Sequence, residues 1–224
     1  MPLAYAEPQG TNESSPQTIT QTLRVPLNDK SRWHEIRYDK IPAHTLRFSE
    51  SGLEISVRRS AMPLLFPLPR PLLVKSIHVK GHLCGNIKVA PEQQGKKGHD
   101  DYSLRVGLVE PGPRTLTLLE RWTAASWVKA LFEFAPAGSG IAKVHFLNLG
   151  VNGSEIGSTR QHPMSKLLEE EVVAAPRADG SFEFTRRFDP PLEVSALWIS
   201  ADGDDTKSSF ETVINRIELE THSP

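Results

Sequence analysis

Apolar and polar side chains alternate along most of this 224-residue chain, the period-2 pattern that is typical of β-strands with one buried face. Leu53, Ile55 and Val57 alternate with polar residues, and Leu46 and Phe48 do so before them, with a Ser-Glu-Ser-Gly turn between the two runs. This pattern predicts a β-hairpin. The full set of strands that the alternation predicts covers residues 33–38, 46–48, 53–57, 73–83, 104–108, 142–149, 182–188, 192–200 and 213–219.

Prolines and helical spacing interrupt this pattern in three places. Four prolines fall between residues 63 and 71, and since proline cannot donate to a ladder, Met62–Arg70 is expected to be an edge or an irregular crossover. Helical spacing with a capping threonine predicts a helix over Thr123–Phe134. A second short helix is predicted over Met164–Val173.

Many strands with one or two short helices, and no strand–helix alternation, predict an all-β fold. We expect an antiparallel β-sandwich of the jelly-roll, galactose-binding-like type. The length suits one domain over residues 22–224, and 18 prolines with 15 glycines favour many short elements joined by turns.

Residues 1–21 are polar and lack an apolar period, so we predict a disordered tail. Ala4-Tyr5-Ala6 matches the end of a secretory signal, with its charged and apolar regions missing. Two interpretations stay open. A signal-peptide remnant would favour a periplasmic or secreted protein, whereas an ordinary N-terminus would be compatible with a cytoplasmic protein.

Composition excludes several classes of function. A net charge of −1 gives no field for nucleic acid, and no apolar run is long enough to span a bilayer. The single cysteine, Cys84, excludes an intramolecular disulfide and a cysteine-rich zinc site; it is expected to be buried. The sequence does not give the oligomeric state.

Two acidic segments flank predicted strands. Asp100 and Asp101 precede one strand, and Asp202, Asp204 and Asp205 follow another. If the two strands are neighbours, five carboxylates meet at one end of a sheet, where they can ligate calcium or bind a polar ligand. The alternative is that they only fix turn geometry.

Four further residues are candidates for contacting a ligand. Arg105 lies on the same strand face as Asp101, where the pair forms a solvated salt bridge or, in a concave sheet, holds a ligand. Tyr102 is the candidate aromatic platform. His145 and Asn148 could line a groove, although a half-buried, hydrogen-bonded histidine is the alternative.

Catalytic motifs are missing from the sequence. It has no Gly-x-Ser-x-Gly, His-Glu-x-x-His or phosphate-binding glycine loop. Glu169-Glu170-Glu171 is interpreted as a solvated helix face, because adjacent residues point apart and a glycosidase needs converging carboxylates.

Three segments occur in a characteristic order: Ser60-Ala61-Met62-Pro63-Leu64, then Gly98–Val106 with its Gly-His-Asp-Asp-Tyr start, then Ile199–Thr206 with its Asp-Gly-Asp-Asp-Thr loop. This order resembles a bacterial exported family known only as a domain of unknown function. The sequence departs from that family at Met62 and at residues 77–80. The resemblance implies a jelly-roll sandwich of the galactose-binding and carbohydrate-binding type, and export.

Three hypotheses follow for the function. The first is an exported, non-catalytic sandwich that binds a glycan or a small polar ligand, with or without a structural calcium ion. The second is a lyase or hydrolase that acts on a polysaccharide. The third is an interaction module of an envelope protein.

Overall fold

The computed structural model describes residues 20–113, 115, 126–133, 140–162 and 165–222. Of the predicted tail, only Thr20 and Gln21 are described, and they begin the first strand. Ala4-Tyr5-Ala6 lies outside the described residues.

The described chain is almost entirely β-structure, which confirms the all-β class. Eleven strands form a sheet in the order β3-β4-β11-β5-β10-β6-β7-β9-β8, with β1 paired to β11 and β2 to β5. Their bounds are β1 Thr20–Arg24, β2 His34–Glu35, β3 Thr45–Ser49, β4 Gly52–Arg58, β5 Leu64–Gly85, β6 Arg105–Gly112, β7 Gly140–Leu149, β8 Thr159–Gln161, β9 Leu168–Ala174, β10 Ser181–Ser200 and β11 Ser209–His222. One α-helix, α2, covers Ser126–Glu133, and three short 3₁₀ turns cover Lys30–Arg32, Pro91–Gln93 and Gly153–Glu155.

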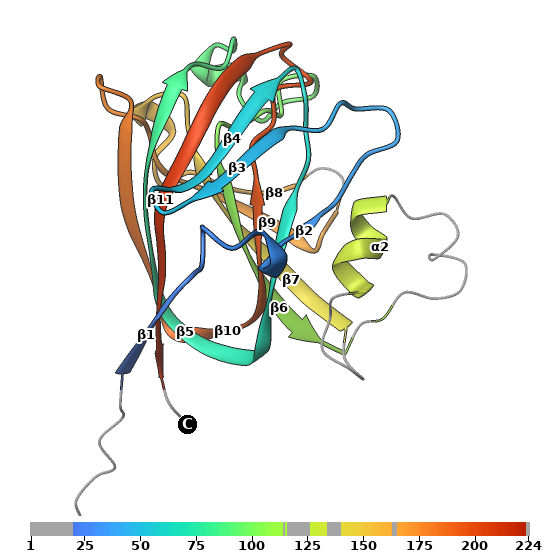
Figure 1. Ribbon diagram of the computed structural model, residues 1–224, viewed down its shortest axis with the longest axis vertical. Helices are drawn as coiled ribbons and strands as arrows, with labels where there is room; N and C mark the ends of the chain where they lie inside the picture. Colours follow the sequence, from blue (N-terminus) through green and yellow to red (C-terminus); the bar gives the residue numbers. More distant parts are fainter. Residues whose placement is uncertain (1–19, 114, 116–125, 134–139, 163–164, 223–224) are drawn as a thin grey trace, which may run out of the picture.

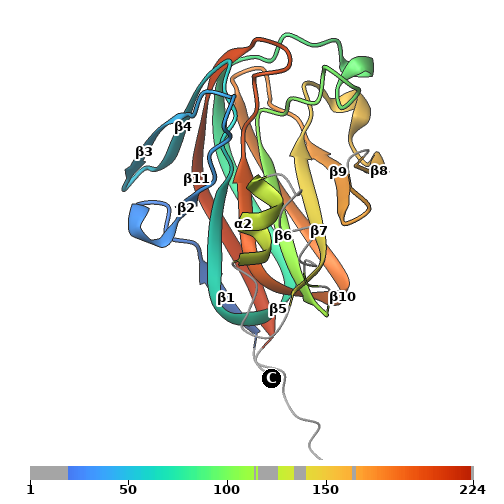
Figure 2. The same ribbon diagram turned by 90° about the vertical axis from the view of Figure 1, so that its right-hand side faces the viewer.

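Two long strands, β5 and β10, take part in both layers of the sandwich. Residues 76–82 of β5 pair with 181–187 of β10, whereas residues 64–67 pair with 196–199. Between these paired stretches the register shifts, and both strands curve at the end of the molecule drawn at the bottom of Figure 1. The bend folds one sheet into two facing layers, which Figure 2 shows edge-on.

The prediction of an edge or crossover over Met62–Arg70 is wrong at Leu64 and Leu65, which lie inside the sheet between β10 and β2. It agrees with the pairing from Phe66 onward, because Phe66 and Pro67 pair with β10 on one side only. Alternate N–H groups of a strand point to the same side, so Pro67, Pro69 and Pro71 remove donors on one side and leave the other side able to pair.

The main core fills the space between the layers. It includes Leu53 and Ile55 of β4, facing Val106 and Leu108 of β6, and all four are almost completely buried. A smaller apolar cluster occupies the opposite face of β6, β7 and β10, where Phe132 of α2 packs against it. The layer that contains β6, β7 and the end of β10 is called the second layer below. The helix covers its outer face, as Figure 2 shows.

Several local predictions can be compared with the structure. The hairpin is confirmed as β3 and β4, and α2 lies within the predicted 123–134 helix, although residues 123–125 and 134 lie outside the described residues. The second predicted helix is wrong: residues 168–173 belong to β9, which pairs parallel to β7 although the other strand pairs of the described residues are antiparallel. Met164 lies outside the described residues. The strand predicted over residues 33–38 is reduced to β2.

Two further observations concern the surface. Cys84 is exposed, contrary to the prediction, because it lies near the end of β5. No helix among the described residues is long and apolar enough to cross a membrane.

Candidate functional site

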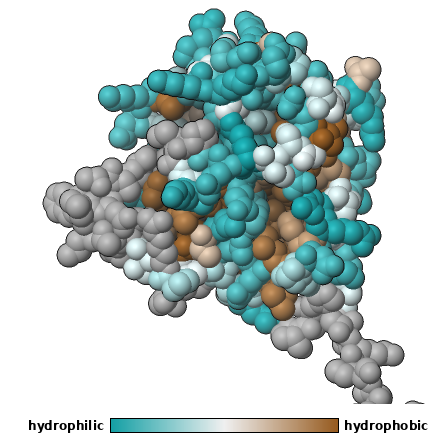
Figure 3. Space-filling model, turned by 180° about the vertical axis from the view of Figure 1, so that it is seen from behind, coloured by the Kyte–Doolittle hydropathy of each residue, from teal (hydrophilic) through white to brown (hydrophobic). Residues whose placement is uncertain are grey.

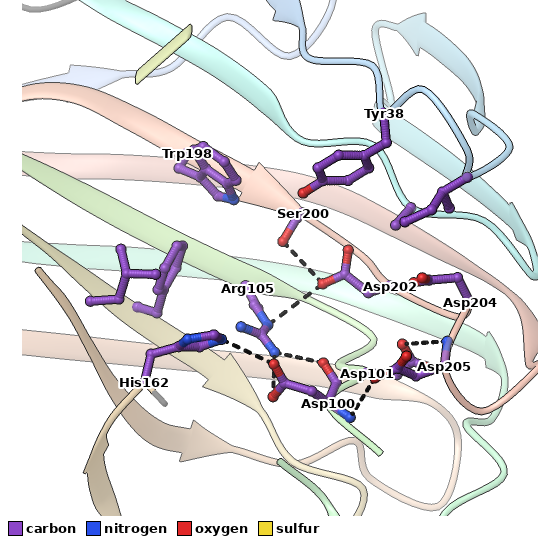
Figure 4. Close-up of a pocket in the computed structure, with 14 residues that line it drawn as sticks. Tyr38, Asp100, Asp101, Arg105, His162, Trp198, Ser200, Asp202, Asp204 and Asp205 are labelled. Atoms are coloured by element: carbon purple, nitrogen blue, oxygen red, sulfur yellow. Dashed lines mark hydrogen bonds and ion pairs between the residues drawn. The ribbon is translucent and has the colours of Figure 1, made fainter. Parts of the chain in front are cut away.

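The two acidic segments meet at one end of the second layer. Strands β6 and β10 are antiparallel neighbours, with Arg105 opposite Ser200. The start of β6 and the end of β10 therefore lie side by side at the same end of the sheet. A pocket of about 230 Å³ lies there (Figure 4). All five predicted metal ligands line it: Asp100, Asp101, Asp202, Asp204 and Asp205.

Arg105 is the buried cation of this pocket. Its Nη1 donates to Glu170 Oε1 at 2.7 Å, and its Nη2 donates to the Asp100 carbonyl oxygen at 2.7 Å and to Asp100 Oδ1 at 3.0 Å. Its Nε lies 3.6 Å from Asp202 Oδ2. The guanidinium also stacks on the Tyr102 ring, 4.5 Å from its centroid. Burial opposes the charge, but the surrounding carboxylates outweigh it and raise the pKa of Arg105.

A second cation completes an ion-pair cluster around Asp100. Arg160 of β8 donates from Nη2 to Asp100 Oδ1 at 2.7 Å and also contacts Glu170. His162 Nε2 lies 3.1 Å from Asp100 Oδ2. Burial acts against ionisation of Asp100, but the hydrogen bond from His162 and the charges of Arg105 and Arg160 lower its pKa to about 2. Asp100 is therefore a charged, fully engaged carboxylate.

Asp101 holds the acidic loop of β10 in place. Its carboxylate accepts from Thr206 N at 2.7 Å, from Thr206 Oγ1 at 2.5 Å and from Asp205 N at 3.3 Å. Asp205 Oδ2 in turn accepts from Asp100 N at 3.4 Å. The turn-fixing alternative therefore describes Asp101, whose oxygens satisfy backbone donors of the 202–206 loop.

Asp202 and Asp204 differ from their neighbours because their negative charge is poorly balanced. Burial raises the pKa of Asp202 to about 7 against the charge of Arg105, and Asp101 and Asp204 add to the rise. Burial and Asp101 also raise the pKa of Asp204. These two carboxyls are the groups of the pocket that gain most from a hydrogen-bond donor or a cation.

An aromatic wall faces the carboxylates. Tyr38, Phe146 and Trp198 line the pocket, and the last two rings meet edge to face with centroids 5.9 Å apart. The Phe146 ring lies over Gly107 of β6, where a Cβ would come within 2.8 Å of that ring and 3.0 Å of Trp198 Cβ. Figure 4 shows Tyr38 and Trp198 on the opposite side of the pocket from Asp100 and Asp101.

The pocket also contains a group with metal-ligand geometry. One ligand atom each of Asp100, His162 and Glu170 lies within 4.8 Å of the others, so these residues could hold a metal ion. Arg105 and Arg160 already neutralise both carboxylates, and their charges would repel a divalent cation. Asp202 and Asp204 carry oxygen donors whose charge is less balanced.

The structure gathers three of the four predicted ligand contacts. Arg105 lies directly opposite Asn148 of β7, and Tyr102 stacks on Arg105. Tyr102 and Asn148 are buried, and both line a smaller cavity next to the pocket. Arg105 pairs with Asp100 rather than with Asp101, which the strand alternation had favoured.

His145 does not join this group, because it lies on the other face of β7. Its Nε2 contacts Glu110, and its Nδ1 lies 3.4 Å from Glu169 Oε2. With Arg186 and Phe188 it lines a separate groove of about 890 Å³ between β7, β9 and β10. The face of the molecule on that side shows apolar patches between hydrophilic ridges (Figure 3).

Sequence reasoning missed Tyr38, Arg160, His162 and Glu170. Glu170 had been assigned to a solvated helix face, but in β9 it is 3% exposed and points away from Glu169 and Glu171. The alternation Leu168, Glu170, Val172 is the signal that could have placed it on a strand. Arg160 and His162 belong to or follow β8, a three-residue strand in a stretch without an apolar pattern.

No protein-family model matches this chain, and no curated protein matches it. Among solved structures, a xylan-binding module is 10% identical, with a TM-score of 0.36 and coverage of 90% of this chain and 97% of the module. A family 11 carbohydrate-binding module from Clostridium thermocellum, in complex with a β-1,3-1,4-mixed-linked tetrasaccharide, is 7% identical, with a TM-score of 0.43 and coverage of 92% and 96%.

The exoplasmic/lumenal domain of VIP36 in a Ca²⁺/Man-bound form is 9% identical, with a TM-score of 0.39 and coverage of 88% of both chains. These neighbours are of the type that the sequence resemblance implied. Their TM-scores lie below 0.5, so they carry no argument about the ligand.

Proposed function

We propose that the pocket beside Arg105 binds a small neutral saccharide or polyol without catalysing a reaction on it. The observation that carries this proposal is the pairing of two unlike walls in one cavity. Tyr38 and Trp198 offer apolar ring surface, and Ser200 and Asp202 offer oxygen atoms next to it. A sugar presents the matching surfaces, with C–H groups on its ring face and hydroxyl groups around its edge.

The size and charge of the pocket narrow the ligand. Its volume of about 230 Å³ is below the range of roughly 300–1,000 Å³ that is common for drug-sized ligands, which favours a single sugar residue or a chain end. Without a bound calcium ion, the carboxylates of Asp202 and Asp204 would repel an anion. A neutral sugar is therefore preferred over a uronic acid of the same shape.

A glycan array with the purified full chain tests this proposal. We expect binding to neutral glycans, and we expect Tyr38→Ala to weaken it about tenfold, equivalent to ~1.4 kcal/mol, through loss of ring contact. Tyr38→Phe keeps the ring and should retain most of the binding. Ile156→Ala, at an exposed residue away from the pocket, is the matched control and should leave binding unchanged. Equal binding by Tyr38→Ala and wild type would contradict the proposal.

A structural calcium ion is a second feature of this proposal, supported by the unbalanced charge of Asp202 and Asp204. A bound ion stabilises the folded state by mass action. We expect the melting temperature to rise with millimolar calcium and to fall again with EDTA, and the rise to be lost in Asp204→Asn. An unchanged melting temperature of the wild-type protein in millimolar calcium would contradict the proposed calcium site.

A polysaccharide hydrolase or lyase is the alternative, and one observation favours it. The raised pKa of Asp202 lets its carboxyl carry a proton near neutral pH, which a general acid requires. Against it, His145 lies on the other sheet face from Tyr102 and Arg105. Chromatography of array-positive glycans after incubation separates the two: a product that Asp202→Asn no longer forms would establish the enzyme.

We also propose export to the periplasm or the medium, with support from the sequence resemblance to an exported family. Expression of the gene in its native cell, followed by cell fractionation, tests this. Recovery in the cytoplasm alone would contradict it.

A further inference from the structure

Asn148 is a fully buried polar residue. It lies in β7 between Leu147 and Leu149, both buried in the main core, and directly opposite Arg105. Its side chain is 0% exposed. Neither its Nδ2 nor its Oδ1 has a hydrogen-bond partner among the described residues. Burial of an amide without hydrogen-bond partners costs free energy, so such an amide in a folded protein needs an explanation.

A cavity of about 170 Å³ lies beside this amide. Its walls include Tyr102, Arg160, Glu170 and Val172. Gln94 also lines it, but that amide is already used: Nε2 donates to the Asp101 carbonyl at 3.0 Å and Oε1 accepts from Val151 N at 2.9 Å. Asn148 is therefore the amide in this cavity of which neither the nitrogen nor the oxygen has a partner among the described residues.

The charges around the cavity largely cancel. Arg160 contacts Glu170, and Arg105 donates to the same carboxylate from the other side. Glu155 is a further charged residue of the lining, and it disfavours an anion. The ion-pair cluster thus forms a wall between this cavity and the saccharide pocket and leaves the cavity suited to a neutral ligand.

We propose that this cavity is a second binding site, which takes a vicinal diol of a small neutral polyol through the Asn148 side chain. One hydroxyl donates to Oδ1, and the neighbouring hydroxyl accepts from Nδ2, so both groups of the amide are satisfied. At roughly 30 Å³ per water-sized group the volume accommodates about six such groups, the size of glycerol. The site does not depend on the saccharide pocket.

Side-chain amide NMR of the ¹⁵N-labelled full chain tests the proposal with glycerol as the probe. We expect the Asn148 amide pair to shift in a saturable way with glycerol. 1,3-Propanediol, whose hydroxyls are not vicinal, should produce at most a tenth of that shift at equal concentration. Asn86→Ala, at an exposed asparagine, is the matched control and should behave as wild type. The indole N–H of Trp198 reports the saccharide pocket in the same spectrum, so each site can fail without the other.

Asn148→Leu gives a second measurement. Leucine replaces an unpaired amide with an apolar group of similar size, so we expect a higher melting temperature without polyol and no glycerol-dependent stabilisation. A linear shift, an equal response to 1,3-propanediol, or a lower melting temperature of Asn148→Leu would each show that the amide is held by structural water and would overturn the proposal.

Discussion

Arg105 joins three segments that are distant in sequence. Its guanidinium contacts Glu170 of β9, Asp100 before β6 and Asp202 after β10, and it is 6% exposed. A buried carboxylate that loses its cation keeps its desolvation penalty without the compensating attraction. The cluster therefore stabilises the site only while all of its members are present.

Replacement of this arginine should consequently be costly. We expect Arg105→Met to lower the free energy of unfolding by about 3 kcal/mol, because Glu170 stays buried and keeps only Arg160 as a cationic contact. Urea denaturation measures the change. Arg47→Met, which breaks an exposed pair with Glu54, is the control and should cost less than about 1 kcal/mol. Equal effects of the two substitutions would show that the cluster is not energetically coupled.

His44 supplies the pH dependence of the region behind the pocket. Its Nε2 accepts from Met62 N at 3.0 Å, and its Nδ1 lies 2.8 Å from Ser60 Oγ, so the ring is neutral in the folded protein. Burial lowers the pKa of His44 to about 4.

The contribution of His44 to stability should therefore fall as the pH falls from about 6.5, the unfolded value, towards 4, because the unfolded chain binds a proton that the folded one excludes. Asp202, whose pKa is raised to about 7, contributes in the opposite direction over this window. Chemical denaturation at a series of pH values measures this slope. In His44→Gln, whose amide can still accept from Met62, the slope in this window should be reduced. An unchanged slope would assign the pH dependence to another group.

At the scale of elements, the alternation of apolar residues predicted the strands and the hairpin that depend on local sequence alone. The β3–β4 hairpin and the inward faces of β6 and β10 follow from it. The two long bent strands could not be predicted, because their bends depend on pairing between residues more than a hundred positions apart. The β9 strand was missed because its glutamates suit a helix surface, and only its neighbour β7 makes a strand favourable.

The candidate site was partly predictable for the same reason. Acidic loops at strand ends are visible in the sequence, so all five aspartates were found. Arg160 and His162 could not be found, because β8 has three residues and its place next to β9 is a tertiary property. Trp198 belongs to the smaller apolar cluster, and only its register opposite Gly107 places it at the pocket as well.

Gly107 is the point where element packing shapes the pocket. A Cβ there would meet Phe146 at 2.8 Å and Trp198 Cβ at 3.0 Å. We expect Gly107→Ala to destabilise the protein by about 1–3 kcal/mol through overpacking and to shift its tryptophan emission. Gly153→Ala, where the nearest atom lies 3.8 Å away, is the matched control, with an effect within about 0.5 kcal/mol. Unchanged stability and emission in Gly107→Ala would mean that the rings move freely.

At the scale of the whole molecule, the sandwich separates stability from binding. The main core between the layers holds the fold, while the outer face of the second layer carries the saccharide pocket and the Asn148 cavity. Strands β6 and β10 supply side chains to the main core from one face and to the pocket from the other. The pocket is therefore positioned by strands that are fixed in the core. This arrangement favours a preformed site over one that orders on binding.

The central claim is that this preformed pocket selects a neutral sugar. Isothermal titration calorimetry measures it most directly, with a neutral monosaccharide and its uronic acid titrated into the wild-type protein in the presence of EDTA. The account predicts a 1:1 complex with the neutral sugar and at least about tenfold weaker binding of the uronic acid, because Asp202 and Asp204 repel its carboxylate. Equal or tighter binding of the uronic acid would contradict it.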